Sequence, residues 1–322
     1  MNILVIRPGA IGDALLSFPT LHALRSKYGA KRITFVSNAS VLPLAHAWKL
    51  ANEVADFEET RWSELFSTAG IRNAQLRKLL AATNMAICWL GDPDHLVETN
   101  LRKAGVKKII IAPGRPPEHS FTHVAEYLAS TVKIPAHQVR LWHPALSGTP
   151  EVSRTIAIHP GSGSERKNWP IASYAEIIKS LWQEHYEVLL LAGPAEEQKL
   201  AYLQRHLKPP AGLCRTLVSA PLPEIAQQLQ QCRGYLGNDS GVTHLAAMLG
   251  VPTVAIFGPG SRTSNWEPLG KHVTIIQQPD LNFLASSTVM ITISAVILSA
   301  AKNPRVPGRM LWANADSSLR SE

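Results

Sequence analysis

Short apolar stretches alternate with helical stretches along most of this 322-residue chain, and the alternation runs in two blocks. Strands that alternate with helices form a parallel sheet covered by helices on both faces, so each block is predicted to be a Rossmann-like α/β domain. In the first block the apolar pattern predicts strands at 2–7, 32–37, 85–90 and 107–112, with helices near 13–28, 40–50, 71–82, 95–104 and 118–131.

A proline-rich connection separates the two blocks. The periodic pattern lapses over residues 135–152, which include Pro135 and Pro144. Because single cores stop growing near ~250–300 residues, we expect two domains, at 1–145 and 152–285. The second block is predicted to contain strands at 154–158, 187–192, 215–218, 233–236, 252–257 and 272–277, with helices at 171–185, 195–206, 222–231 and 241–249.

Residues 286–322 form an atypical tail. Residues 284–301 are apolar, but hydroxyl side chains interrupt them and they barely reach the ~20 residues that a membrane span needs. A packed terminal helix or strand is therefore expected in place of a membrane helix. The last twenty or so residues are polar and serine-rich, and we expect them to be disordered because they bury too little apolar area to offset chain entropy.

The net charge of +8 is concentrated in the first half of the chain. Residues 1–145 hold 17 Lys and Arg against 11 Asp and Glu, which leaves +6 of the excess there. Such an excess favours anionic partners, and an anionic lipid or a sugar phosphate fits. No long basic block or aromatic-interleaved basic strand appears, so nucleic acid is not an expected partner.

Three cysteines, at 88, 214 and 232, lack C-x-x-C spacing and are odd in number. This pattern disfavours both a disulfide framework and a zinc site. Buried small hydrophobic side chains in a reducing cytoplasm are the expected alternative. The N-terminus has no basic region ahead of its apolar run, so it is interpreted as a first strand and not as a signal peptide.

The segment from Gly237 to His244 has the pattern of a strand end, a tight turn and a helix start. Asp239, Ser240 and Gly241 stand at this start, where free backbone N–H groups and the positive end of the helix dipole attract an anion. His244 lies one turn further on and could face the same ligand. A histidine packed within the helix is the alternative.

A second glycine-rich loop follows the strand at 154–158 and contains Gly161, Ser162, Gly163 and Lys167. Two such loops on neighbouring strands suggest that the ligand is a nucleotide diphosphate. Trp169 and Pro170 could fix the loop and aim Lys167, whereas the alternative is a solvated surface lysine. The Ser162 hydroxyl could donate to phosphate or serve turn geometry.

Two carboxylates, Glu196 and Glu197, follow the strand at 187–192. At a strand end they could hold ribose hydroxyls, or they could be first-turn charges that the helix dipole favours.

The loop after the first strand contains Gly9, Gly12 and Asp13. Its glycines are spaced G-x-x-G, and the second strand ends without the acidic residue that a dinucleotide ribose would need, so a nicotinamide dinucleotide cofactor is disfavoured. Asp13 is either an N-cap worth about 1 kcal/mol or a general base that faces the cleft.

Two spacings resemble metal sites, namely Asp92-Pro-Asp94 and the pair His119 and His123 on one predicted helix face. Neither has a third ligand nearby, and proline between aspartates is common turn chemistry, so we expect no metal and no cofactor. A departing diphosphate would then be stabilised by helix ends, hydroxyl groups and Lys167.

Taken together, the motifs resemble glycosyltransferase family 9, the lipopolysaccharide heptosyltransferases of GT-B fold. The resemblance covers most of the chain and rests on three segments: Arg7-Pro-Gly-Ala-Ile-Gly-Asp13, Lys167-Asn-Trp-Pro170, and Asn238-Asp-Ser-Gly-Val-Thr-His244 leading to Phe257-Gly-Pro259. It implies two Rossmann-like domains whose parallel sheets face a central cleft, with the acceptor on the first domain and the nucleotide-sugar donor on the second.

The resemblance also implies roles for individual residues. Asp13 would be the catalytic base, Lys167 and Ser162 would bind donor phosphates, and residues 239–244 would line the donor site. Glu196 or Glu197 would hold the donor ribose. Gly9 and Gly12 would belong to the acceptor-side loop.

The implied reaction is inverting, metal-independent transfer of heptose from ADP-heptose to the inner core on lipid A. The protein would then be cytoplasmic, and it could associate peripherally with the cytoplasmic face of the inner membrane. Residues 303–322 depart from the family, whose last helix normally returns toward the first domain. Two alternatives stay open: a GT-B transferase or epimerase that uses another nucleotide sugar such as a UDP-sugar, and an inactive nucleotide-sugar-binding homologue.

Overall fold

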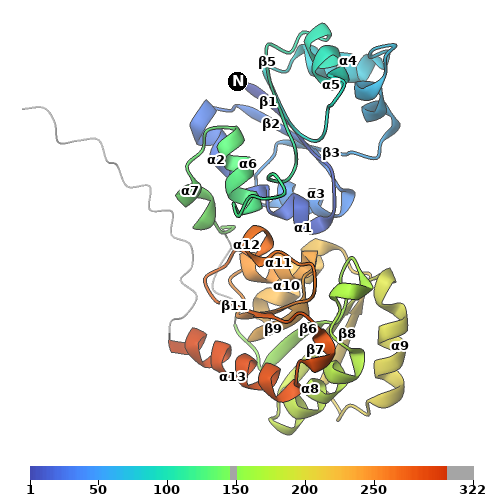
Figure 1. Cartoon of the computed structure of the whole chain (residues 1–322), viewed down its shortest axis with the longest axis vertical. Helices are drawn as coiled ribbons and strands as arrows, with labels where there is room; N and C mark the ends of the chain where they lie inside the picture. Colours follow the sequence, from blue (N-terminus) through green and yellow to red (C-terminus); the bar gives the residue numbers. More distant parts are fainter. Residues whose placement is uncertain (146–150, 303–322) are drawn as a thin grey trace, which may run out of the picture.

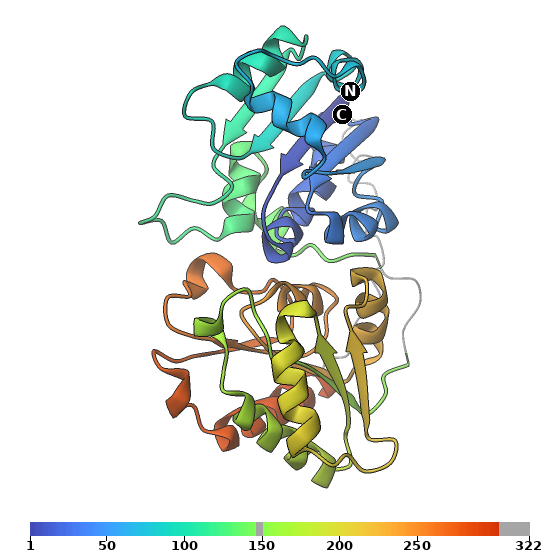
Figure 2. The same ribbon diagram turned by 90° about the vertical axis from the view of Figure 1, so that its right-hand side faces the viewer.

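The computed structural model describes residues 1–145 and 151–302, and it contains two parallel β-sheets in two lobes (Figure 1). We call the elements from β1 to α7 the N-terminal lobe and those from β6 to α13 the C-terminal lobe. Figure 2 shows from the side that the lobes meet at one junction.

The N-terminal sheet has the strand order β3-β2-β1-β4-β5. Residues that alternate along β1 point to opposite faces: Ile3 and Val5 belong to one buried cluster, Leu4 and Ile6 to another. Helices cover both faces, which explains why the strands have continuous apolar sequences. The elements are β1 (Asn2–Arg7), α1 (Ile11–Leu15), α2 (Phe18–Tyr28), β2 (Arg32–Ser37), α3 (Leu42–Ala47), β3 (Glu53–Asp56), α4 (Ala74–Ala81), β4 (Met85–Trp89), α5 (Leu96–Lys103), β5 (Lys108–Ala112), α6 (Val124–Thr131) and α7 (Ala136–Arg140).

The C-terminal sheet has the strand order β11-β10-β9-β6-β7-β8, and all of its pairings are parallel. Its central strands β6 and β9 are buried along their whole length. The elements are β6 (Thr155–His159), α8 (Ile171–Gln183), β7 (Glu187–Ala192), α9 (Glu197–His206), β8 (Cys214–Val218), α10 (Leu222–Gln231), β9 (Gly234–Asn238), α11 (Gly241–Met248), β10 (Thr253–Phe257), α12 (Thr263–Trp266), β11 (Val273–Gln277) and α13 (Ser286–Lys302).

Three predicted features of the N-terminal lobe differ from the structure. The helix predicted at 13–28 is two helices, because the chain turns at Ser17 and restarts as α2 with a proline in its first turn. The strand β3 was missed because it has only four residues and two of them are acidic. The helix predicted from residue 118 begins at Val124, so His119 lies outside it and cannot share a helix face with His123.

The segment after residue 285 packs on the C-terminal lobe as α13. Val289, Ile293 and Ile297 are buried in the cluster that includes β6, β9 and β10, so the lobe extends past the predicted end at 285. None of the helices among the described residues has the length and apolar composition to cross a membrane. The expected disorder of the last twenty residues concerns 303–322, which lie outside the described part of the chain.

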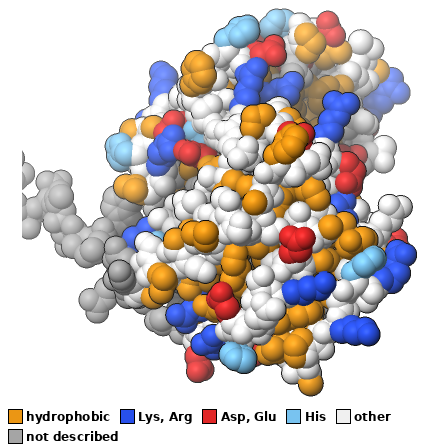
Figure 3. Space-filling model, turned by 60° about the horizontal axis from the view of Figure 1, so that its bottom comes forward, with side chains coloured by type: hydrophobic (Ala, Val, Ile, Leu, Met, Phe, Trp, Pro, Cys, Tyr) orange, Lys and Arg blue, Asp and Glu red, His pale blue; other side chains and the backbone are white. Residues whose placement is uncertain are grey.

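Figure 3 shows the face of the C-terminal lobe that lies away from the junction. Basic and acidic side chains are interspersed on this face, with apolar side chains between them. The lobe therefore presents no single basic patch on this side.

The packing of α13 can be tested by paired substitutions on one helix. Ile293 is 3% exposed and Ile291 is 71% exposed. We expect Ile293→Ala to lower the free energy of unfolding by about 2–5 kcal/mol, because it removes buried methylenes and leaves a cavity. Ile291→Ala should change it by less than about 0.5 kcal/mol. Urea unfolding followed by circular dichroism measures both, and equal effects of the two changes would contradict the packing.

Candidate functional site

A cavity of about 900 Å³ lies between the two lobes. Its walls are the loops that follow the carboxyl ends of strands in both sheets, which is where open α/β folds bind ligands. The N-terminal lobe contributes residues that follow β1 and β5, and the C-terminal lobe contributes residues that follow β6, β9 and β10. The volume is in the range of small-molecule and cofactor sites.

The starts of α1 and α11 meet at the floor of this cavity, and glycine allows the contact (Figure 1). A Cβ on Gly241 would lie 2.6 Å from Cγ2 of Ile11, and a Cβ on Gly12 would lie 3.0 Å from Cδ2 of His244. Any larger side chain at Gly241 would push the two helix starts apart. The amino ends of two helices, one from each lobe, therefore converge on one cavity.

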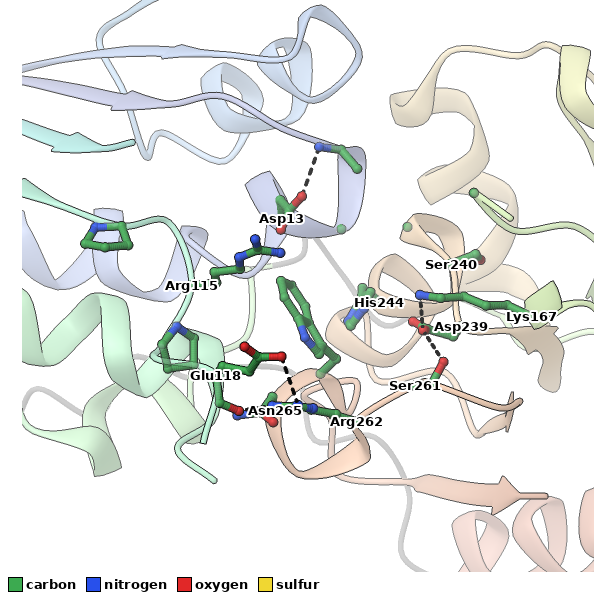
Figure 4. A pocket seen from close by; sticks show the side chains of 18 of the residues that line it. Asp13, Arg115, Glu118, Lys167, Asp239, Ser240, His244, Ser261, Arg262 and Asn265 are labelled. Carbon is green, nitrogen blue, oxygen red and sulfur yellow. Dashed lines mark hydrogen bonds and ion pairs between the residues drawn. The ribbon is translucent and has the colours of Figure 1, made fainter. Parts of the chain in front are cut away.

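Asp13 is held in a fixed orientation by two donors. Arg7 Nη2 donates to Oδ1 at 3.0 Å, and the backbone N–H of Ala10 donates to Oδ2 at 3.1 Å. Arg7 is 5% exposed, and burial lowers the pKa of its guanidinium although the Asp13 charge opposes that shift. The Asp13 side chain is 26% exposed and lines the cavity, as Figure 4 shows. Asp13 is therefore not the predicted N-cap, which is Ala10; it is the third residue of α1, it bonds the N-cap N–H, and it lines the cavity.

Gly9 makes this orientation of Asp13 possible. Its φ is +126°, and a Cβ there would lie 2.9 Å from Asp13 Oδ2. Both the backbone conformation and the space require glycine. Gly9 does not line the large cavity, whereas Gly12 does.

On the opposite wall, Lys167 and Asp239 form an ion pair. Lys167 Nζ donates to Asp239 Oδ2 at 2.7 Å, and the Ser261 hydroxyl donates to the same oxygen at 2.9 Å (Figure 4). Trp169 is 1% exposed, and its backbone N–H donates to the Asn238 side chain at 3.0 Å. This anchor fixes the loop that carries Lys167, as its sequence predicts.

His244 lies between Asp13 and the Lys167–Asp239 pair in Figure 4. It is 4% exposed, and its Nδ1 has no hydrogen-bond partner among the described residues. Burial lowers the pKa of His244 to about 4, with Asp239 and Asp13 opposing the shift and His123 and Lys167 adding to it. The ring is therefore neutral at pH 7. His244 is therefore packed within its helix and also lines the cavity, so the two interpretations of this residue do not exclude each other.

The glycine-rich loop after β6 brings Gly163, but not Ser162, to the cavity wall. The Ser162 hydroxyl donates to the Ser164 carbonyl at 2.8 Å and accepts from the Ser164 N–H at 3.3 Å. The Ser162 hydroxyl is therefore engaged in the geometry of its own turn. Ser240 and Gly241 line the cavity, and the Ser240 hydroxyl caps α11 by accepting from the Thr243 N–H at 3.4 Å.

Neither Glu196 nor Glu197 lines the cavity. Glu196 is 5% exposed and lies beneath the glycine-rich loop, where a Cβ on Gly161 would be 1.9 Å from its Oε1. Its Oε2 accepts from the Gly193 N–H at 2.8 Å, and the neighbouring His159, whose Nε2 lies 3.7 Å from Oε2, is the main cause that lowers its pKa. Glu197 is exposed in the first turn of α9.

Two stretches of the cavity wall were not predicted from the sequence. One is the proline-rich loop after β5, from which Arg115 points into the cavity without an ion pair to any described residue (Figure 4). The other is the segment from Gly260 to Trp266, which includes α12. Asn265 Nδ2 donates to the carbonyls of Ser120 and Thr122, at 2.8 Å each, so these two stretches bridge the lobes. A charged residue within Pro113-Gly-Arg-Pro-Pro117, directly after a strand, was the available signal.

The sequence patterns that resemble metal sites have other roles. Both carboxylate oxygens of Asp92 accept from the first backbone N–H groups of α5, at 3.0 Å each. Nε2 of His123 lies 2.9 Å from the Glu267 carbonyl, across the junction of the lobes. Over 1–145 and 151–302, no three His, Cys, Asp or Glu side chains are grouped closely enough to hold a metal ion.

The matching family model and the similar proteins agree on one family. Residues 125–288 match the family described as glycosyltransferase family 9 (heptosyltransferase). Lipopolysaccharide heptosyltransferase 2 of Escherichia coli K12 is 34% identical over 301 residues, which cover 81% of this chain and 84% of that protein. Lipooligosaccharide heptosyltransferase 2 of Campylobacter jejuni serotype O:6 is 21% identical over 281 residues, which cover 83% and 85%.

Solved structures show the same architecture. The E. coli ADP-heptose lipopolysaccharide heptosyltransferase II has a TM-score of 0.74 at 21% identity, over 94% of this chain and 100% of that one. The E. coli heptosyltransferase WaaC with ADP has a TM-score of 0.67 at 17% identity, over 92% and 100%. The predicted α/β fold of GT-B architecture is therefore confirmed.

The buried state of His244 generates a pH prediction. An unfolded histidine takes up its proton near pH 6.5, whereas folded His244 does so only near 4. The unfolded state therefore binds more protons in this window, and the free energy of unfolding should fall as the pH drops from about 6.5 to about 4, by at most about 3 kcal/mol.

Urea unfolding of wild type and His244→Gln across this pH range measures the effect. The difference between the two proteins should shrink as the pH falls, while His137→Gln, at an exposed position on α7, controls for the loss of a histidine. A difference that stays constant with pH would show that His244 is not held neutral by the fold.

Proposed function

The chain belongs to glycosyltransferase family 9, and from this premise we propose that it transfers heptose from ADP-heptose to the inner core of lipopolysaccharide on a lipid A-linked acceptor. One observation carries the proposal: Asp13 from one lobe and the Lys167–Asp239 pair from the other line a single cavity. A carboxylate and a cationic anion site on opposite walls are the two parts that glycosyl transfer from a nucleotide diphosphate needs.

The C-terminal lobe is the proposed donor domain, with its predicted core at 152–285. We assign the diphosphate to the start of α11, where Gly241 presents a backbone N–H that has no partner within the helix. Gly163 permits close approach, and Lys167 supplies the positive charge from beside Asp239. Neutral His244 lines the same wall of the cavity.

The N-terminal lobe, 1–145, is the proposed acceptor domain. Asp13 accepts the proton of an acceptor hydroxyl as that oxygen attacks the anomeric carbon from the side opposite the diphosphate, so the reaction inverts the configuration. Arg7 and the Ala10 N–H hold the carboxylate while one side remains open to the cavity. Arg115 gives this wall a free cation suited to an anionic acceptor.

No metal enters this mechanism. Charge that develops on the departing ADP is met by Lys167 and by the amino end of α11, both fixed before the reaction. The lipid-linked acceptor would bring the protein to the cytoplasmic face of the inner membrane, and the +6 charge of residues 1–145 favours peripheral contact with an anionic surface.

The nucleotide and the activity can be tested separately. Isothermal titration with ADP and with UDP identifies the base, and tight binding of UDP alone would favour the transferase or epimerase that uses a UDP-sugar. Release of ADP from ADP-heptose in the presence of a core-oligosaccharide acceptor tests transfer. Binding of ADP without any release under these conditions would favour the inactive binding homologue.

Replacing the proposed base should affect turnover and not donor binding. We expect Asp13→Asn to lower kcat by about 10²–10⁴-fold, because general-base help has this size, while the Kd for ADP changes little. Steady-state kinetics and titration with ADP measure the two quantities. A kcat equal to that of wild type would remove Asp13 from the role of base.

Replacing the proposed phosphate cation should affect donor binding. Lys167→Ala removes a charge and leaves the Asp239 carboxylate facing the diphosphate with only Ser261 as partner. We expect the Kd for ADP to rise by about 10-fold or more, since a charged hydrogen bond contributes about 1.5–3 kcal/mol. Lys179→Ala, at an exposed position on α8, is the matched control. Unchanged ADP affinity in Lys167→Ala would mean that the donor site is misplaced.

A further inference from the structure

A chain of buried polar side chains runs beneath the donor wall and crosses three neighbouring strand ends. Glu196 follows β7, His159 ends β6, and Ser240 follows β9, and these strands are adjacent in the sheet. His159 Nε2 lies 3.7 Å from Glu196 Oε2, and His159 Nδ1 lies 3.3 Å from Ser240 Oγ. All three residues are at least nine-tenths buried.

The donor and the acceptor in each contact among these buried polar side chains can be assigned. The Thr243 hydroxyl donates to the Asn238 carbonyl at 2.5 Å, so the Tyr235 hydroxyl is the donor in its 2.9 Å bond with Thr243. The neighbouring His159 is the main cause that lowers the pKa of Glu196, against the effect of burial, so the carboxylate is an acceptor and His159 presents a proton to it on Nε2. His159 Nδ1 then accepts the proton of the Ser240 hydroxyl.

This pattern fixes the orientation of Ser240. Its hydroxyl points into the lobe, toward His159, and its oxygen accepts from the Thr243 N–H as the cap of α11. The first N–H group of α11, at Gly241, is then left without a partner in the helix, and Gly241 lines the cavity. The orientation of this N–H group depends on Ser240, and that of Ser240 depends on His159.

The same contacts bear on the role of Glu196. Its carboxylate is covered by the glycine-rich loop, where Gly161 leaves no room for a Cβ; it accepts from the Gly193 N–H, and His159 Nε2 lies 3.7 Å away. A ligand in the cavity cannot reach it without displacing that loop. An ionised buried carboxylate is costly unless it is paired, and here its partner is His159.

We propose that His159, held by Glu196, is a positioning residue that fixes Ser240 and the first turn of α11 against the diphosphate of the donor. The inference rests on the proposed donor site at α11. It assigns Glu196 to the support of the diphosphate site through His159, in place of a contact with the ribose.

Two probes separate these roles of Glu196. Inorganic pyrophosphate carries the diphosphate but no ribose, and ADP carries both. We expect Glu196→Gln to weaken the binding of ADP and of pyrophosphate by the same factor, about 3–10-fold, measured by isothermal titration. Glu224→Gln, an exposed carboxylate in the first turn of α10, is the control for a lost charge. Loss of ADP affinity with unchanged pyrophosphate affinity would overturn the proposal and favour a ribose contact.

Substitutions at His159 test the connection to Ser240. We expect His159→Leu to weaken both ligands by about 10-fold, and His159→Asn to recover most of the affinity because its amide oxygen can occupy the place of Nδ1 and accept from Ser240. In the His159→Asn background, Glu196→Gln should cause no further loss, since the path through Nε2 is gone. An equal loss in both backgrounds would overturn the proposal.

Circular dichroism and thermal unfolding of each variant check that it is folded. Should His159→Leu fail to fold, the nearly isosteric pair His159→Asn and Glu196→Gln still decides the question. A folded wild type that binds neither ADP nor pyrophosphate would overturn the proposed function. Wild-type binding with unaffected variants would overturn only the positioning role.

Discussion

The contact between the starts of α1 and α11 is the constraint on which the rest of the site depends. Gly12 and Gly241 lack the side chains that would hold these helices apart, so the carboxyl ends of the two sheets can close on one cavity. Asp13 follows Gly12 directly, and Ser240 precedes Gly241. The proposed base and the proposed diphosphate site are therefore each one residue from a glycine at which the lobes touch.

Three carboxylates at or beneath the cavity wall each have a partner. Arg7 holds Asp13, Lys167 and Ser261 hold Asp239, and His159 faces Glu196. Buried or half-buried charges need such partners to offset their loss of hydration, and the partners also fix the orientation of the charges. The site is thus organised before a substrate arrives, which is what electrostatic stabilisation of a transition state requires.

Sequence reasoning predicted most strands and both glycine turns, because alternating apolar stretches and glycine positions report local structure. It missed β3, which is short and acidic, and the break after α1. It brought Asp13, Lys167 and Asp239 to one cleft, because the ends of parallel strands share an edge. Three contacts could not be predicted, because they depend on the three-dimensional arrangement of the chain. The Ser162 hydroxyl bonds within its own turn, and the loop at Gly161 covers Glu196. Asn265 donates to the Ser120 carbonyl in the other lobe.

The five-residue length of α1 has a mechanical consequence. A helix this short has no room to bend between Gly12, which touches the other lobe, and Asp13, which carries the carboxylate. If the two lobes slide or tilt relative to each other, the Asp13 carboxylate moves together with the contact at Gly12. The distance from this carboxylate to the sugar and the contact between Gly12 and Gly241 therefore change together.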